Sequence, residues 1–160
     1  EKKDARHLGL VLERKLCPWY AVYATVGLVF PAFSGVVLDS NFVLDLIEQI
    51  VSVGLAEEFF YRGYLQNRFC KWLGDWRGLL FSATLFGSGH LVSRIVTVGF
   101  DYIGLASTVA AQTFVGGLLL GLIFLRANNI WASAVLHISS NMYLNHYMQL
   151  LEFLRRLLIP

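Results

Sequence analysis

Charged side chains are scarce in this sequence of 160 residues, because only 15% of them are Asp, Glu, Lys or Arg. A soluble globular domain usually carries about a quarter charged residues. Here 56% of the residues are hydrophobic and the mean hydropathy is +0.58. The composition therefore argues against a soluble globule. It also excludes a disordered chain, which combines low hydrophobicity with high net charge.

Cysteine is also scarce, and neither positive nor negative charges are in large excess. The two cysteines, Cys17 and Cys70, are too few for a disulfide framework and do not form a CxxC metal knuckle. We interpret both as buried apolar thiols. The formal net charge is only +2, and no basic run is interleaved with aromatic residues. These features argue against nucleic acid as a partner.

Long apolar runs are abundant instead. A transmembrane helix needs about 20 mostly apolar residues. The chain therefore predicts an all-α fold, a polytopic membrane helix bundle, in which residues 1–160 form a single domain without an internal repeat. About five spans are expected, joined by short polar links at 39–41, 71–77 and 126–129. The predicted spans are Cys17–Leu38, Phe42–Phe69, Gly78–Gly99, Tyr102–Leu125 and Ile130–Leu151.

Basic residues indicate which links face the cytoplasm. The start of the chain and the ends of the second and fourth predicted spans are basic, and they share one side if five spans alternate with a cytoplasmic N-terminus. Arg155 and Arg156 do not fit this pattern. Either the last span is re-entrant or tilted, or the count differs by one. The basic residues after the second and fourth spans are Arg68, Lys71, Arg77 and Arg126.

The second predicted span contains charges that a bilayer disfavours. A charged side chain in the bilayer interior costs roughly 2.5–3.5 kcal/mol, so such groups pair inside the bundle and usually mark a working site. Glu58 and Arg62 are four residues apart with the acid first, which predicts an ion pair. Glu57 is rotated by about 100° from Glu58 on an α-helix. It can therefore stay unpaired and act as a general base, unless the cluster merely anchors a helix end.

Two other spans carry polar residues. His90 follows Phe86-Gly87-Ser88-Gly89, and His137 and Asn141 share one helix face. Side by side in an apolar helix, His137 and Asn141 could stabilise an oxyanion, or they could form a polar staple between helices. A lone histidine such as His90 is more often a hydrogen-bonded core residue than a catalyst. The pair Gly117-x-x-x-Gly121 favours close helix packing, within the chain or in a dimer.

Three motifs occur in order in three membrane segments: Glu-Glu-x-x-x-Arg, Phe-x-x-x-His and His-x-x-x-Asn. Together they resemble the CAAX-protease and bacteriocin-processing (CPBP) family of intramembrane endopeptidases. The stretches 114–126 and 131–133 resemble that family as well. The motif core covers about residues 48–141. Family members commonly have six to eight spans, which is more than the five expected here.

The resemblance implies roles for six residues. Glu57 would activate water, His90 would hold and orient it, and His137 with Asn141 would form the oxyanion side. Glu58 and Arg62 would be supporting residues. The resemblance implies a glutamate-type mechanism without metal or other cofactor, and the sequence has no His-Glu-x-x-His motif. Zinc held by two histidines and one glutamate remains an alternative.

The resemblance also implies a substrate class, a membrane-anchored protein or peptide. The substrate is a prenylated C-terminal peptide in eukaryotic relatives, and a leader or a C-terminal sorting segment in bacterial ones. The short chain favours a bacterial or archaeal protein of the cytoplasmic (inner) membrane that processes a sorting or leader segment, as in the sortase-like branch. Two alternatives stay open: a non-cleaving binding protein of the bacteriocin-immunity type, and a small proton or ion transporter.

Overall fold

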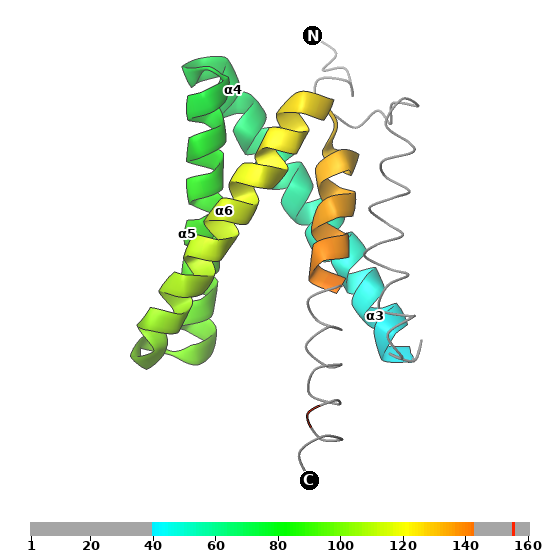
Figure 1. Cartoon of the computed structure of the whole chain (residues 1–160), viewed down its shortest axis with the longest axis vertical. Helices are drawn as coiled ribbons and strands as arrows, with labels where there is room; N and C mark the ends of the chain where they lie inside the picture. Colours follow the sequence, from blue (N-terminus) through cyan, green and yellow to red (C-terminus); the bar gives the residue numbers. More distant parts are fainter. Residues whose placement is uncertain (1–39, 143–154, 156–160) are drawn as a thin grey trace.

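The described part of the chain is helical. The computed structural model describes residues 40–142 together with Arg155, and these contain helices and short breaks but no strand (Figure 1). The expected all-α bundle is confirmed for this part. The predicted first span, Cys17 and the end of the predicted fifth span lie outside the described residues.

The first described helix runs without interruption from Ser40 to Leu73. It begins as α3 (Ser40–Glu48), passes through two π-helical segments, η4 (Gln49–Glu57) and η5 (Phe59–Gln66), and ends as α4 (Asn67–Leu73). From the sequence we expect an α-helix with about 3.6 residues per turn at this place. That expectation is wrong on both sides of Glu58, where the helix is π-helical. Segments of π-helix are rare and occur frequently at functional sites.

A glycine residue interrupts the helical conformation at each of the next two helix boundaries. Gly74, with φ of 83°, separates α4 from α5 (Asp75–Val98), so the link expected at 71–77 is helical except at that glycine. Gly99, with φ of 90°, ends α5 before the short η6 (Phe100–Tyr102). Both residues adopt a positive φ, which glycine tolerates because it lacks a Cβ atom.

The helix α6 (Ile103–Ala127) ends at Asn128, which adopts the left-handed conformation with φ of 47°. Asn129 follows, and its side-chain Oδ1 accepts a hydrogen bond of 2.8 Å from the backbone N–H of Trp131. This is the capping contact that asparagine makes at the start of a helix. Residues 130–142 are helical.

Two of these helices are long and apolar enough to cross a membrane, Asp75–Val98 and Phe100–Ala127 including η6. They correspond to the third and fourth predicted spans. The 24 residues of α5 extend over about 36 Å, which exceeds the roughly 30 Å of a bilayer hydrocarbon core. The total number of spans stays a prediction.

Small residues let the helices approach closely. A Cβ atom on Gly87 of α5 would lie 2.9 Å from the carbonyl oxygen of Ala110 in α6. Gly117 and Gly121 of α6 pack against α5 in the same way, Gly117 against Ala83 and Gly121 also against Gln66. The predicted use of this glycine pair for packing within the chain is confirmed.

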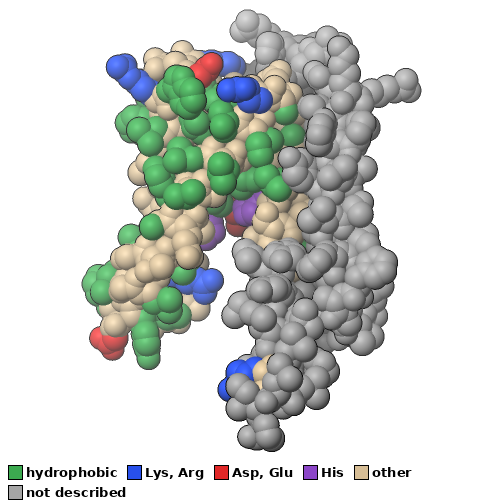
Figure 2. Space-filling model, in the orientation of Figure 1, with side chains coloured by type: hydrophobic (Ala, Val, Ile, Leu, Met, Phe, Trp, Pro, Cys, Tyr) green, Lys and Arg blue, Asp and Glu red, His purple; other side chains and the backbone are tan. Residues whose placement is uncertain are grey.

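The distribution of side chains is that of a protein in an apolar solvent. Large hydrophobic side chains lie outside, among them Val96 at 81% exposure and Phe100 at 73%, and Figure 2 shows such side chains spread over the visible face. Polar side chains are buried instead, including Glu58, Arg62 and Gln66 at 0–1% exposure. Exposed apolar surface on this scale requires a partner, and a lipid bilayer supplies one.

The closest helix contact gives a stability prediction. A Cβ atom on Gly78 would collide with the backbone N and Cα atoms of Cys70, which cannot move as a side chain can. We expect Gly78→Ala to lower the free energy of unfolding by about 1–3 kcal/mol through overpacking. Thermal unfolding in detergent measures this. Gly104→Ala is the matched control, because nothing lies within 4 Å of that position; equal stability of the two variants would contradict the packing.

Candidate active site

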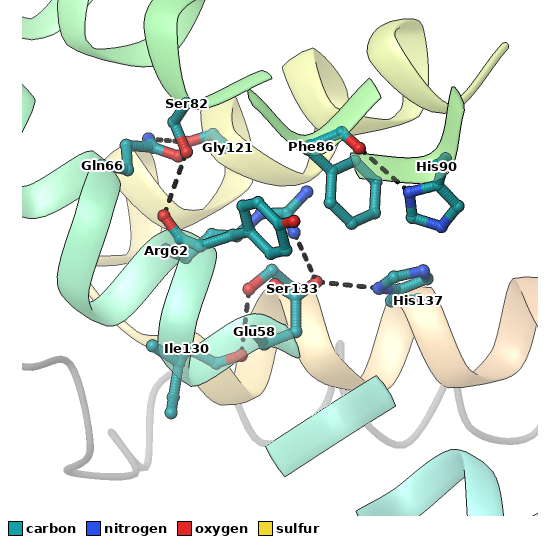
Figure 3. A network of polar contacts seen from close by, with 11 residues as sticks. Glu58, Arg62, Gln66, Ser82, Phe86, His90, Gly121, Ile130, Ser133 and His137 are labelled. Atoms are coloured by element: carbon teal, nitrogen blue, oxygen red, sulfur yellow. Dashed lines mark hydrogen bonds and ion pairs between the residues drawn. The ribbon is translucent and has the colours of Figure 1, made fainter. Parts of the chain in front are cut away.

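A buried carboxylate joins two helices at the centre of the molecule. Glu58 is 0% exposed, and its Oε1 lies 3.0 Å from Nη1 of Arg62, which is 1% exposed. The same oxygen lies 2.8 Å from Nδ1 of His137 in the helix at 130–142. Figure 3 shows the carboxylate between these two partners. The ion pair predicted between Glu58 and Arg62 is confirmed, and His137 is an additional member.

The Arg62 guanidinium is held by an aromatic ring as well as by charge. Its Cζ atom lies 4.5 Å from the centroid of the Phe86 ring, a cation–π geometry that is strongest in a desolvated site. Neither Nη atom has a well-aligned hydrogen bond to the described residues, although the ion pair is short. The positive charge is therefore balanced by Glu58 and by the ring face rather than by hydrogen bonds.

Phe86 connects the polar residues of three helices. Its ring is 2% exposed and contacts Tyr61 at 4.9 Å, His90 at 4.6 Å and His137 at 5.8 Å between centroids, with angles of 80°, 64° and 77° between the ring planes. The two imidazoles thus lie beside the same ring, although 47 positions separate them in the sequence. Figure 2 shows histidine and acidic atoms together in a recess on this face. The structural role of Phe86 was missed from the sequence, where its only signal was its spacing of four from His90.

Hydrogen bonds at Nδ1 fix the orientation of both imidazoles. Nδ1 of His90 lies 3.0 Å from the carbonyl oxygen of Phe86, which can only accept (Figure 3). We therefore assign the proton to Nδ1, which leaves Nε2 with a lone pair in the neutral ring. His137 likewise directs Nδ1 to Glu58. Both histidines keep Nε2 available, because no described residue hydrogen-bonds to it.

Glu57 is separate from the ion pair formed by its neighbour. Its side chain is half-buried, and its Oε2 atom is inaccessible to solvent yet has no hydrogen-bond partner among the described residues. Its charge interacts with Tyr61 and Arg62. A buried polar atom without a partner is costly and calls for an explanation. This carboxylate oxygen could accept a hydrogen bond from a bound water molecule or from a substrate N–H group.

Asn141 lies on the same helix as His137 but has a different partner. Its Nδ2 donates a hydrogen bond of 2.9 Å to Oε1 of Gln49, in η4. The second amide hydrogen is not used by this bond. Gln49 was missed from the sequence, because nothing local connects it to a residue 92 positions away. Asn141 and His137 share a face as expected, and both bind the helix that carries Glu57 and Glu58.

The described residues do not form a metal site. They contain no cluster of three or more His, Cys, Asp or Glu side chains placed to hold a metal ion. Glu58 and His137 are hydrogen-bonded to each other rather than directed at a common centre. The zinc alternative stays a prediction that these residues do not test.

These observations define a class of protein, a membrane-embedded helical bundle with a buried polar site. A comparison with protein-family models matched residues 39–143 to "Type II CAAX prenyl endopeptidase Rce1-like". The match covers more than half of the chain, so the chain belongs to this family of CAAX-type intramembrane proteases. The resemblance seen in the sequence is confirmed at the level of the family. The comparison with curated proteins gave no match, and neither did the comparison with solved structures.

The buried ion pair gives a second prediction. Glu58→Gln removes the charge that balances Arg62, and breaking a buried pair by changing one partner costs about 3–5 kcal/mol. We expect a large fall in the free energy of unfolding, measured by thermal or denaturant unfolding in detergent. Glu48→Gln is the matched control, because Glu48 is an exposed carboxylate on the same helix. Unchanged stability of the Glu58 variant would show that the pair is not structural.

Proposed function

We propose that this protein is an intramembrane endopeptidase that uses Glu57 to activate a water molecule. The observation that carries the proposal is that Glu57 has a buried, unpartnered Oε2 atom and lies outside the ion pair of its neighbour, whereas Oε1 of Glu58 contacts both Arg62 and His137. The Oε2 atom of Glu58 is also without a hydrogen-bond partner among the described residues, so the difference between the two carboxylates is the ion pair. Two neighbouring carboxylates thus have different environments, and such a difference commonly separates a catalytic group from a structural one.

The attacking water is held between Glu57 and His90 in this proposal. His90 receives a hydrogen bond from the water at Nε2, since its Nδ1 is committed to the Phe86 carbonyl oxygen. Glu57 removes the water proton as the water oxygen bonds to the substrate carbonyl carbon. The C–N bond then breaks, and Glu57 delivers the proton to the leaving amine nitrogen. General acid–base catalysis of this kind is worth about 10²–10⁴ in rate.

The developing oxyanion is stabilised by His137 and Asn141. Asn141 supplies the amide hydrogen that Gln49 does not take. His137 must donate from Nε2 while Nδ1 also donates to Glu58, so it acts in its doubly protonated form. The Glu58 carboxylate, 2.8 Å away, attracts that charge, although it also faces the charge of Arg62. Each donor aimed at an oxyanion is worth about 10²–10³ in rate.

The substrate is a membrane-anchored protein or peptide, and we favour a C-terminal sorting or leader segment processed at a prokaryotic cytoplasmic membrane by a multi-pass protein. No cofactor takes part in this mechanism. Purified protein incubated with prenylated and unprenylated tail peptides, with and without a chelator, tests the proposal. Binding without cleavage would favour the immunity-type alternative, and a pH-dependent flux across liposomes would favour the transporter.

The general base gives a third prediction. Glu57→Gln keeps the shape of the side chain but cannot accept the water proton, so kcat should fall at least about 10²-fold. Thermal stability should stay near that of the unmodified protein, since Glu57 is outside the ion pair. A peptide-cleavage assay and a melting curve on the same preparation measure both quantities. Full activity in this variant would overturn the assignment.

The oxyanion side gives a fourth prediction. Asn141→Ala should lower kcat by about 10²–10³ with little change in KM. Gln49→Met is the matched variant, because it removes the partner of Asn141 but keeps its amide, and we expect a smaller loss of kcat. If both variants lose activity equally, and in proportion to a loss of thermal stability, Asn141 is a polar staple and not an oxyanion donor.

A further inference from the structure

Basic side chains gather at one end of the bundle, away from the candidate active site. This basic cluster consists of Arg68, Lys71, Arg77 and Arg126, all of them exposed. Figure 2 shows Lys and Arg atoms at the end where α4 meets α5 and where α6 finishes. Among the described residues Asp75 is the acidic residue beside them, so the described side chains at this end have a positive excess.

The lengths of the two helices would place this end at the level of lipid headgroups. Both α5 and α6 exceed the thickness of the hydrocarbon core, and the cluster surrounds the first turns of α5 and the last turn of α6. Trp72 and Trp76, on either side of Gly74, are 68% and 71% exposed. Exposed tryptophan beside basic residues is typical of the interface between hydrocarbon and headgroups.

A pocket of about 290 Å³ opens beside Lys71 of the basic cluster, between α4 and the end of α6. Lys71, Asn67 and Asn128 line its polar part, and Phe124 and Leu125 line its apolar part. The pocket thus offers a cation and amide groups next to an apolar wall. An anionic headgroup attached to an acyl chain has the complementary arrangement.

We propose that this pocket binds the headgroup of an anionic phospholipid. Lys71 contacts the phosphate, the three neighbouring arginines add attraction from the surface, and Phe124 and Leu125 contact the first part of the acyl chains. Asp75 also lines the pocket and opposes the phosphate, so the attraction rests on the excess of the four basic residues over this carboxylate. The bound lipid holds the α4–α5 turn at the membrane surface.

Lipid-dependent stabilisation of the purified protein in a neutral detergent tests the proposal. Thermal unfolding is recorded with increasing phosphatidylglycerol, with phosphatidylcholine, or with inorganic phosphate. We expect phosphatidylglycerol alone to raise the melting temperature in a saturable way. Because a basic residue near an anionic surface contributes about fivefold in affinity, Lys71→Gln should raise the half-saturating concentration of phosphatidylglycerol by about that factor.

Arg94→Gln is the matched control, since it removes the same charge from an exposed position near the far end of α5. It should leave the half-saturating concentration unchanged. Equal stabilisation by phosphatidylcholine, or by inorganic phosphate, would overturn the proposal. An equal effect of the Lys71 and Arg94 substitutions would overturn it as well. That result would show that the lipid responds to the overall charge of the protein and does not bind in the pocket. Peptide cleavage is not part of the measurement, so its outcome is independent of the proposed function.

Discussion

The carboxylate of Glu58 is the contact through which the helices of the site are positioned. One oxygen serves both the Arg62 guanidinium and the His137 imidazole, and so connects the first described helix to the helix at 130–142. An ionised carboxylate and a guanidinium at 0–1% exposure are stable only if each remains beside the other. Arg62 in turn lies over Phe86, whose ring borders His90 and His137. Charge balance at one residue therefore brings polar groups from three helices to one place.

Two adjacent carboxylates have different surroundings in this arrangement. Both carboxylates have a buried Oε2 atom without a hydrogen-bond partner in the described part of the chain, but only Glu58 also contacts Arg62 and His137 through its Oε1 atom there. The charged groups of the site are buried among apolar side chains, so their contacts occur where water is scarce and each is worth more than in solution. In the lipid proposal, the basic cluster at the end of the bundle lies in the headgroup region of the membrane, where its charges contact lipid phosphates.

Much of this could be predicted from the sequence, because two of the signals are local. Apolar length located α5 and α6, and the spacing of Glu58 and Arg62 indicated their ion pair. The bond from His137 to Glu58 and the bond from Asn141 to Gln49 could not be predicted, since they depend on how separate helices pack. The π-helical turns around Glu58 were also missed, because the sequence was interpreted with the regular α-helical period. Each of the three motifs was ambiguous by its spacing alone. Only the resemblance to the family indicated that they belong to one site.

The central claim is that a water molecule activated by Glu57, and not Glu57 itself, attacks the peptide bond while Glu58 stays structural. The most direct test is turnover of a tail peptide in H₂¹⁸O, followed by mass spectrometry of the product and of the enzyme peptide that contains Glu57. The account predicts ¹⁸O in the new C-terminal carboxylate of the product and none in Glu57. Label in the Glu57 carboxylate would reveal a covalent intermediate and contradict the account, as would the absence of any turnover.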